Sequence, residues 1–345
     1  MTTTLERTEE RHNAQGFPSL SDKGGLWARG CATLGAVVWA GTAVAARAGV
    51  ARIGAIELMF LFAPLVIVPL GMELGRVIGG TGRLDEMARW VQPFGAAAAL
   101  VALLLPPGRW AGLLACGWMM VCLLMAGAGV VDIISATWSE AGESAGSTLV
   151  HSRLFVSLLA VARIDLVVGG SWLVASRLGM RPLGIQEPIG LLTAVHFHFA
   201  GFATAMIAAA TLRFAAGLRG ERWLERLLPF VVGMPYVVAI GFVISPALKM
   251  VAAILFSVSV AGLAVALRSC GRRAEPRAAR VLLQVAAAAV FAGMVLSGVY
   301  AVADFMGSDV LTIPQMARTH GILNGVGFCM AGILGWLVES GPDTR

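Results

Sequence analysis

The sequence predicts an all-α integral membrane protein, a polytopic helical bundle with about ten transmembrane helices and both termini in the cytoplasm. Charged residues make up only 13% of the chain and hydrophobic residues 58%, whereas a soluble domain carries about 25% charged residues. The apolar runs approach the roughly 20 residues that a helix needs to cross a bilayer. None shows the period-two alternation of an outer-membrane β-barrel. The 42 glycines favour close packing between helices in lipid.

Ten apolar runs define the expected spans. The third is short and begins near Trp90, so an interfacial helix is an alternative for it. Only Ser245 and Pro246 separate the seventh run from the eighth, which indicates a tight turn or a kinked re-entrant pair. In chain order the expected spans are residues 29–47, 55–73, 89–106, 110–131, 154–176, 189–211, 228–246, 249–267, 281–301 and 316–338.

The distribution of positive charge tests this count. When alternate loops are assigned to two sides, 18 Lys and Arg residues fall on the side of the termini and seven on the other, with Arg163 inside a span. Cytoplasmic loops of membrane proteins carry the excess of Lys and Arg. The sequence therefore predicts an even number of spans, cytoplasmic termini and multi-pass insertion in the inner (cytoplasmic) membrane of the cell.

A single transmembrane domain is expected. Residues 1–28 form a polar cytoplasmic tail without the features of a cleaved signal peptide, residues 29–338 form the helical domain, and residues 339–345 form a short cytoplasmic tail. Residues 132–150 are expected to be a cytoplasmic loop, and the basic hairpin at residues 268–280 is expected to contact membrane lipids. The formal charge of +6 is explained by such loops, so no nucleic-acid partner is expected, and no protein partner can be inferred. The five cysteines show no CxxC spacing and are interpreted as packed thiols.

Two histidines of the sixth span, His196 and His198, are the first candidate site residues. An ionisable side chain within a bilayer costs several kcal/mol, so such a residue is a functional candidate. Positions i and i+2 of a helix lie about 200° apart, so the two rings face different sides. His196 is expected on a small polar face in the bundle interior together with Thr193, Ala200 and Thr204. His198 is expected to form a hydrogen bond to another helix.

The tenth span provides His320 and Asn324, spaced i and i+4 on one face. Gly321 and Gly325 would let a neighbouring helix approach closely. Two interpretations are weighted equally: a functional role, and an interhelical hydrogen bond worth about 0.6–2 kcal/mol.

Two carboxylates are expected near the level of these histidines, Glu57 in the second span and Asp304 at the end of the ninth. Each alone is explained as an interfacial residue, but together with the three histidines they suggest a proton-transfer site, because imidazole gives and takes protons near neutral pH. A transition-metal site that includes His196 and His320 is the weaker alternative, because the neighbouring His198 faces away. No cofactor is therefore expected.

Arg163 and Asp165 lie near the middle of the fifth span, again at i and i+2. They cannot pair with each other in a straight helix, so each needs a partner on another helix or a polar cavity. Lining a substrate cavity and forming interhelical salt bridges are both open. Pro64 and Pro69 are expected to kink the second span and to free backbone carbonyls, as tolerated near cavities.

The sequence lacks several motifs of soluble and membrane catalysis. It contains no GxxxxGK[ST], HExxH or DDxxD segment. These absences argue against ATP hydrolysis and zincin chemistry.

Three segments carry a family resemblance: LFAPLVIVPLG (61–71), WLVASRLGMRPLGIQEPIGLLTAVHFHFAGF (172–202) and ARTHGILNGVGFCMAGILGW (317–336). They resemble the YndJ-like family of bacterial polytopic membrane proteins over about residues 50–338, and LTAVHFHFAGF is the most specific part. The resemblance implies a polytopic, all-helical fold but no particular activity, although members are sometimes labelled transporters. The signature segments contain His196, His198, His320 and Asn324.

Two functions are predicted in order of preference. The first is an intramembrane enzyme that uses His and carboxylate acid–base chemistry on a lipophilic small molecule, for a cyclisation, isomerisation or dehydration of the kind found in secondary metabolism. His196 and His320 would carry protons, Asn324 would orient the substrate, and Arg163 or Asp165 would line the pocket. The second is a small-molecule transporter or export permease, which predicts polar groups in both halves of the membrane. The expected gathering of histidines in the outer half slightly favours the enzyme.

Overall fold

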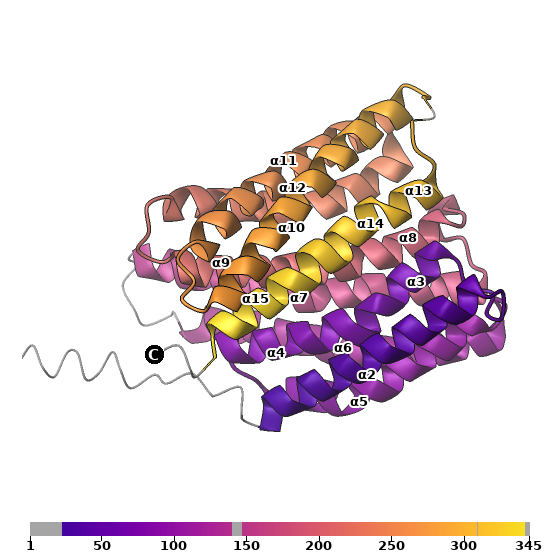
Figure 1. Ribbon diagram of the computed structural model, residues 1–345, viewed down its shortest axis with the longest axis horizontal. Coiled ribbons are helices and arrows are strands. Elements are labelled where there is room, and N and C mark those ends of the chain that lie inside the picture. Colours follow the sequence, from indigo (N-terminus) through magenta and orange to yellow (C-terminus); the bar gives the residue numbers. More distant parts are fainter. Residues whose placement is uncertain (1–22, 140–146, 309, 342–345) are drawn as a thin grey trace, which may run out of the picture.

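The computed structural model describes residues 23–139, 147–308 and 310–341, and every regular element in them is helical (Figure 1). Ten helical segments are long and apolar enough to cross a membrane. Each of them overlaps one of the ten predicted spans, so the predicted all-α, polytopic fold class and the number of spans are confirmed.

The ten segments are built from seventeen helical elements, because three of them change helix type along their length, and one short 3-10 helix lies between segments. In chain order the elements are α2 (Lys23–Arg47), α3 (Ala55–Phe62), η1 (Ala63–Ile67), α4 (Val68–Gly79), α5 (Arg83–Leu104), α6 (Arg109–Ser139), α7 (Ser147–Leu178), η3 (Pro182–Gly184), α8 (Ile189–His196), η4 (Phe197–Ala203), α9 (Thr204–Ala215), α10 (Glu221–Ile244), α11 (Pro246–Gly271), α12 (Arg277–Phe305), α13 (Ile313–Arg318), α14 (His320–Ile322), η5 (Leu323–Met330) and α15 (Ala331–Glu339).

Two groups of long helices enclose the three interrupted segments. Helices α5, α6 and α7 pack side by side in chain order, and so do α10, α11 and α12 on the other side of the bundle (Figure 1). The segments 55–79 and 189–215 lie between these groups and are 78% buried along their most apolar stretch, against 17% for the segment 221–244. The segments 55–79 and 189–215 therefore form the centre of the molecule.

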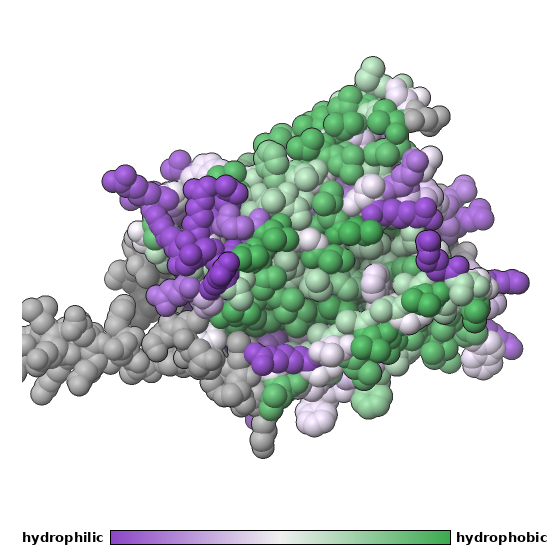
Figure 2. Space-filling view, viewed as in Figure 1, coloured by the Kyte–Doolittle hydropathy of each residue, from purple (hydrophilic) through white to green (hydrophobic). Residues whose placement is uncertain are grey.

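The surface is that of a protein surrounded by lipid. Hydrophobic side chains cover the middle of the face seen in Figure 2, and hydrophilic ones gather at its two ends. Large apolar side chains such as Trp90, Phe94 and Trp110 are more than 60% exposed, which in a membrane places them against acyl chains. We call the end of the bundle that carries Lys23 and Glu339 the terminal end, and the other the opposite end.

The helices extend further than the apolar runs. The third span is a 22-residue helix that begins at Arg83, so it is long enough to cross the membrane and need not be interfacial. The prediction that residues 132–150 form a loop is wrong, because α6 continues to Ser139 and α7 begins at Ser147; residues 140–146 lie outside the described residues. Asp132 lies within α6, where Arg163 on α7 forms a salt bridge with it. Between α10 and α11 the chain makes a tight turn at Ser245.

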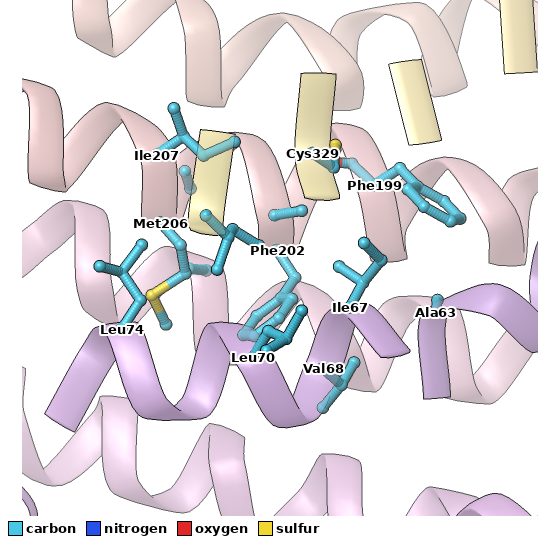
Figure 3. Packing of buried hydrophobic residues seen from close by; sticks show 14 of the residues in the cluster. Ala63, Ile67, Val68, Leu70, Leu74, Phe199, Phe202, Met206, Ile207 and Cys329 are labelled. Carbon is cyan, nitrogen blue, oxygen red and sulfur yellow. The ribbon is translucent and has the colours of Figure 1, made fainter. Parts of the chain in front are cut away.

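Each interrupted segment contains a π-helix, and η1, η4 and η5 contact one another. Figure 3 shows side chains from all three segments packed together, among them Ile67, Phe199, Phe202 and Cys329. Most of these side chains are apolar and fully buried, so the three π-helices meet in a hydrophobic core. We call this region the π-helix junction.

The sequence of η1 explains how its π-turn is tolerated. The backbone N–H of Val68 donates to the Ala63 carbonyl, five residues back. In the same register the Pro64 carbonyl would receive the N–H of Pro69, which proline lacks. The Gln92 side chain on α5 supplies the missing donor, with Nε2 2.6 Å from the Pro64 oxygen. The expected effect of the two prolines, a freed carbonyl, is therefore found, and a neighbouring helix satisfies it.

Candidate functional site

His198 is fully buried, and both of its ring nitrogens are occupied. Its Nδ1 lies 2.7 Å from the Ala194 carbonyl, which can only accept, so Nδ1 carries the proton. Its Nε2 accepts the indole N–H of Trp118 on α6 at 2.9 Å. The rings of Phe60 and Trp118 pack against it at centroid distances of 5.0 and 5.8 Å. The interhelical hydrogen bond predicted for His198 is present, and it holds a neutral imidazole in place.

His196 points to different surroundings from those of His198. It is the last residue of α8, and its side chain is exposed, so the prediction that His196 lies in the bundle interior is wrong. Its Nδ1 donates to the Leu192 carbonyl one turn back, at 2.7 Å. No described residue donates to or accepts from its Nε2. The ring is therefore anchored at one nitrogen and presents the other, which is basic in this tautomer, to a ligand.

His320 is arranged in the same way. It begins α14, directly after the distorted backbone of Thr319, and is half-buried. Its Nδ1 donates to the Gly293 carbonyl of α12 at 3.0 Å, and no described residue bonds to its Nε2. His320 lies within the range of an electrostatic interaction with His196. The structure thus brings together two histidines with free Nε2 atoms and similar anchors.

Asn324 forms a hydrogen bond with the backbone of His320. Its Nδ2 donates to the His320 carbonyl at 2.8 Å. The same amide lies against Gly293, where an added Cβ would come within 2.6 Å of Nδ2. Asn324 and His320 therefore share one contact point on α12, which fixes the position of α14 there. Gly321 and Gly325 permit the expected close approach, in both cases of Met59 on α3.

The two carboxylates predicted at the histidine level have other partners. Glu57 accepts the Gly54 N–H at 3.1 Å and so caps α3, and it acts electrostatically on Arg177. Asp304 forms a salt bridge with Lys249 of α11 at 2.7 Å, at the end of α12. Asp304 lies eleven residues after Gly293, about 16 Å along the helix. The structure therefore does not join Asp304 to the histidine pair.

Arg163 belongs to an ion-pair network nearer the terminal end. Its Nε lies 3.2 Å from Asp85 of α5, and its Nη1 contacts Asp132 of α6. Beside it, Glu73 is 1% exposed and binds both Arg76, at 2.7 Å, and Arg89, at 3.4 Å. Of the two predictions for Arg163, the interhelical salt bridges are found. A small cavity lies between these charged groups.

Asp165 faces away from Arg163, as its i and i+2 spacing requires. It is 0% exposed, and its Oδ1 accepts the hydroxyl of Tyr236 on α10. Its predicted partner on another helix is thus present. Its Oδ2 has no hydrogen-bond partner among the described residues.

Several contributing residues were missed by sequence reasoning. Trp118, Tyr236 and Gln92 lie in apolar runs whose facing sides cannot be read without the neighbouring helices. The ion pair of Glu73 and Arg76 could have been predicted from the sequence. The two residues follow the second apolar run at positions i and i+3 of a helix, a spacing that permits an ion pair. No group of three or more His, Cys, Asp or Glu side chains that could hold a metal ion occurs in residues 23–139, 147–308 and 310–341.

Comparison with known proteins places the chain in a family. The family model described as YndJ-like protein matches residues 58–328, which include η1, η4, most of η5, His196 and His320. The uncharacterized membrane protein YndJ of Bacillus subtilis (strain 168) is 26% identical over 193 residues, which are 56% of this chain and 34% of that relative. This match thus spans about a third of the relative's length. No solved structure matches the chain significantly. The chain is a multi-pass membrane protein and belongs to the YndJ-like family.

Proposed function

We propose that this chain is a transporter that couples the movement of a lipophilic small molecule to protons, with His196 and His320 as its proton-accepting groups. The observation that carries this proposal is the distribution of buried or anchored ionisable groups along the whole bundle. The histidine pair lies toward the opposite end, and the network of Glu73, Arg89 and Arg163 lies toward the terminal end.

Charge in both halves of the bundle changes the balance between the two predicted functions. The preference for an enzyme depended on polar groups gathered in one half. A transporter needs ionisable groups on both sides of a central barrier. Here the π-helix junction, with Phe202 and Ile67 fully buried, separates the two polar regions.

The π-helices also support transport. π-Turns within α-helices occur frequently at functional sites. Substrate sites of transporters are typically formed by helices that are interrupted near the middle of the membrane. His196 directly precedes η4, and His320 lies three residues before η5. Movement of either interrupted segment would therefore change the position of its histidine.

An intramembrane enzyme is the second candidate. It is favoured by one observation, the two anchored imidazoles with available Nε2 atoms, which suit one general base and one general acid after protonation. In this role Asn324 acts as a positioning residue, because it bonds the His320 backbone.

Energised inverted membrane vesicles test both candidates. A panel of lipophilic compounds is added while a fluorescent dye reports the pH gradient, and products are analysed by mass spectrometry. The transporter predicts that certain compounds collapse the gradient unchanged. The enzyme predicts that compounds are converted in vesicles without a gradient.

Matched variants locate the site. His196→Gln and His320→Gln are expected to abolish the compound-dependent response. Arg181→Gln, which changes an exposed side chain in the loop before α8, is expected to leave it unchanged. A wild-type response in both histidine variants would contradict the proposed site.

A further inference from the structure

Asp165 is an ionisable side chain in the bundle that no charged group of residues 23–139, 147–308 and 310–341 neutralises. It is 0% exposed, and among the described residues only the Tyr236 hydroxyl forms a hydrogen bond with it. Its Oδ2 lies against η4, where an added Cβ on Gly201 would come within 2.6 Å. The carboxylate therefore packs tightly against the backbone of Gly201, which provides no side-chain donor to this oxygen.

In the part of the chain that the structure describes, no cation forms a salt bridge with Asp165. From α10 the facing group is Tyr236, whose ring also packs on Phe197 of η4 at a centroid distance of 5.3 Å. From η4 the facing residue is Gly201. Arg163, two residues earlier on α7, is directed to Asp85 and Asp132 instead.

This environment disfavours a permanent negative charge. A buried carboxylate without a cation costs several kcal/mol in a protein interior or a bilayer. Protonation of Oδ2 forms one O–H bond and removes the charge, while Oδ1 keeps the Tyr236 hydrogen bond. By contrast, Glu73 is equally buried but has two arginines, which stabilise its charge.

We propose that Asp165 is a proton-binding site, in which the carboxylate takes up one proton and releases it during the transport cycle. This inference depends on the proposed function and names its second proton site, between the histidine pair and the terminal-end network. A purely structural link between α7 and α10 would need only one oxygen and would be served as well by asparagine. The unpaired Oδ2 beside Gly201 is what distinguishes a proton site.

Dicyclohexylcarbodiimide tests the protonation state. The reagent takes the acid proton on nitrogen, the carboxylate oxygen adds to its central carbon, and rearrangement leaves an N-acylurea of the full reagent mass. In purified full-length protein at mildly acidic pH, we expect mass-spectrometric labelling at Asp165 and its loss in Asp165→Asn. Glu73 serves as the internal control and is expected to stay unlabelled, because it is ion-paired.

Infrared spectroscopy provides a readout that needs no reagent access. The wild type is expected to show a carboxylic acid C=O band at mildly acidic pH that is absent in Asp165→Asn and disappears at alkaline pH. Absence of that band difference would overturn the proposal, as would labelling of Glu73 in preference to Asp165. Both measurements are made without substrate or gradient. A negative infrared or labelling result therefore does not contradict the proposed transport. A negative vesicle assay likewise does not contradict the protonation of Asp165.

Discussion

Trp118 on α6 donates its indole N–H to Nε2 of His198 on η4, over 2.9 Å. Because Nδ1 of the same ring donates to Ala194, this bond completes the hydrogen bonding of the imidazole. The bond also connects the group of α5, α6 and α7 to the π-helix junction. His198 is therefore assigned to the structure of the bundle, and His196 and His320 are the residues that we propose for the chemistry.

Trp118→Phe is expected to destabilise the protein. The variant keeps most of the aromatic volume but leaves the buried Nε2 of His198 without a donor, which costs about 1–3 kcal/mol. Thermal unfolding in detergent measures the change. Trp110→Phe on the same helix is the control, because Trp110 is 62% exposed and its loss should leave the unfolding temperature nearly unchanged.

Replacing either of two glycines of α2 with alanine should change the free energy of unfolding in opposite directions. A Cβ on Gly35 would lie 1.9 Å from the Leu65 carbonyl oxygen of η1, so Gly35→Ala must separate these helices and is expected to cost about 1–3 kcal/mol or more. Gly30 has nothing within 4 Å of its Cβ position. Gly30→Ala is expected to stabilise by about 0.5–1 kcal/mol, through the lower helix propensity of glycine. Equal unfolding temperatures for both variants would refute the close approach of α2 to η1.

The Gln92 hydrogen bond to Pro64 should depend on Pro69. Gln92→Met removes the donor and is expected to cost about 1–3 kcal/mol in the wild type, because the buried carbonyl loses its partner. Pro69→Ala provides a backbone N–H that can replace it in the π register. The penalty of Gln92→Met is therefore expected to shrink in the Pro69→Ala background, as a double-mutant cycle of unfolding free energies would show. Additive penalties would argue against the proposed register.

The orientation of the bundle is predicted from charge alone. With 18 Lys and Arg residues on the side of the termini, a green fluorescent protein fused to the C-terminus is expected to fluoresce in the cytoplasm, and a fused alkaline phosphatase to stay inactive. The reverse pattern would place the terminal end outside. It would also reverse the direction in which protons meet the histidine pair.

Much of the fold follows from the sequence because the dominant force is local in the chain. Each apolar run of sufficient length forms a helix on its own in lipid, so the ten spans could be located. The i and i+2 spacing of His196 with His198, and of Arg163 with Asp165, correctly predicts that each pair divides between different surroundings.

The π-helices could not be predicted in this way. A π-turn shifts the facing side by one residue, and in a run such as APLVI every side is apolar, so the shift leaves no pattern. The loop prediction for residues 132–150 failed for a related reason. The charge of Asp132 favours a loop when only the sequence is considered, but Arg163 on α7 pairs with it. A partner on another helix cannot be identified from one segment of the chain.

The central claim is that His196 and His320 act as one proton-accepting unit, and the vesicle assay on the two single variants and the double variant tests it most directly. Residues that act as a unit give strongly non-additive effects. We predict that His196→Gln and His320→Gln each remove nearly all of the compound-dependent collapse of the pH gradient, and that the double variant removes no more. Near wild-type responses in either single variant, with a loss only in the double variant, would contradict the account.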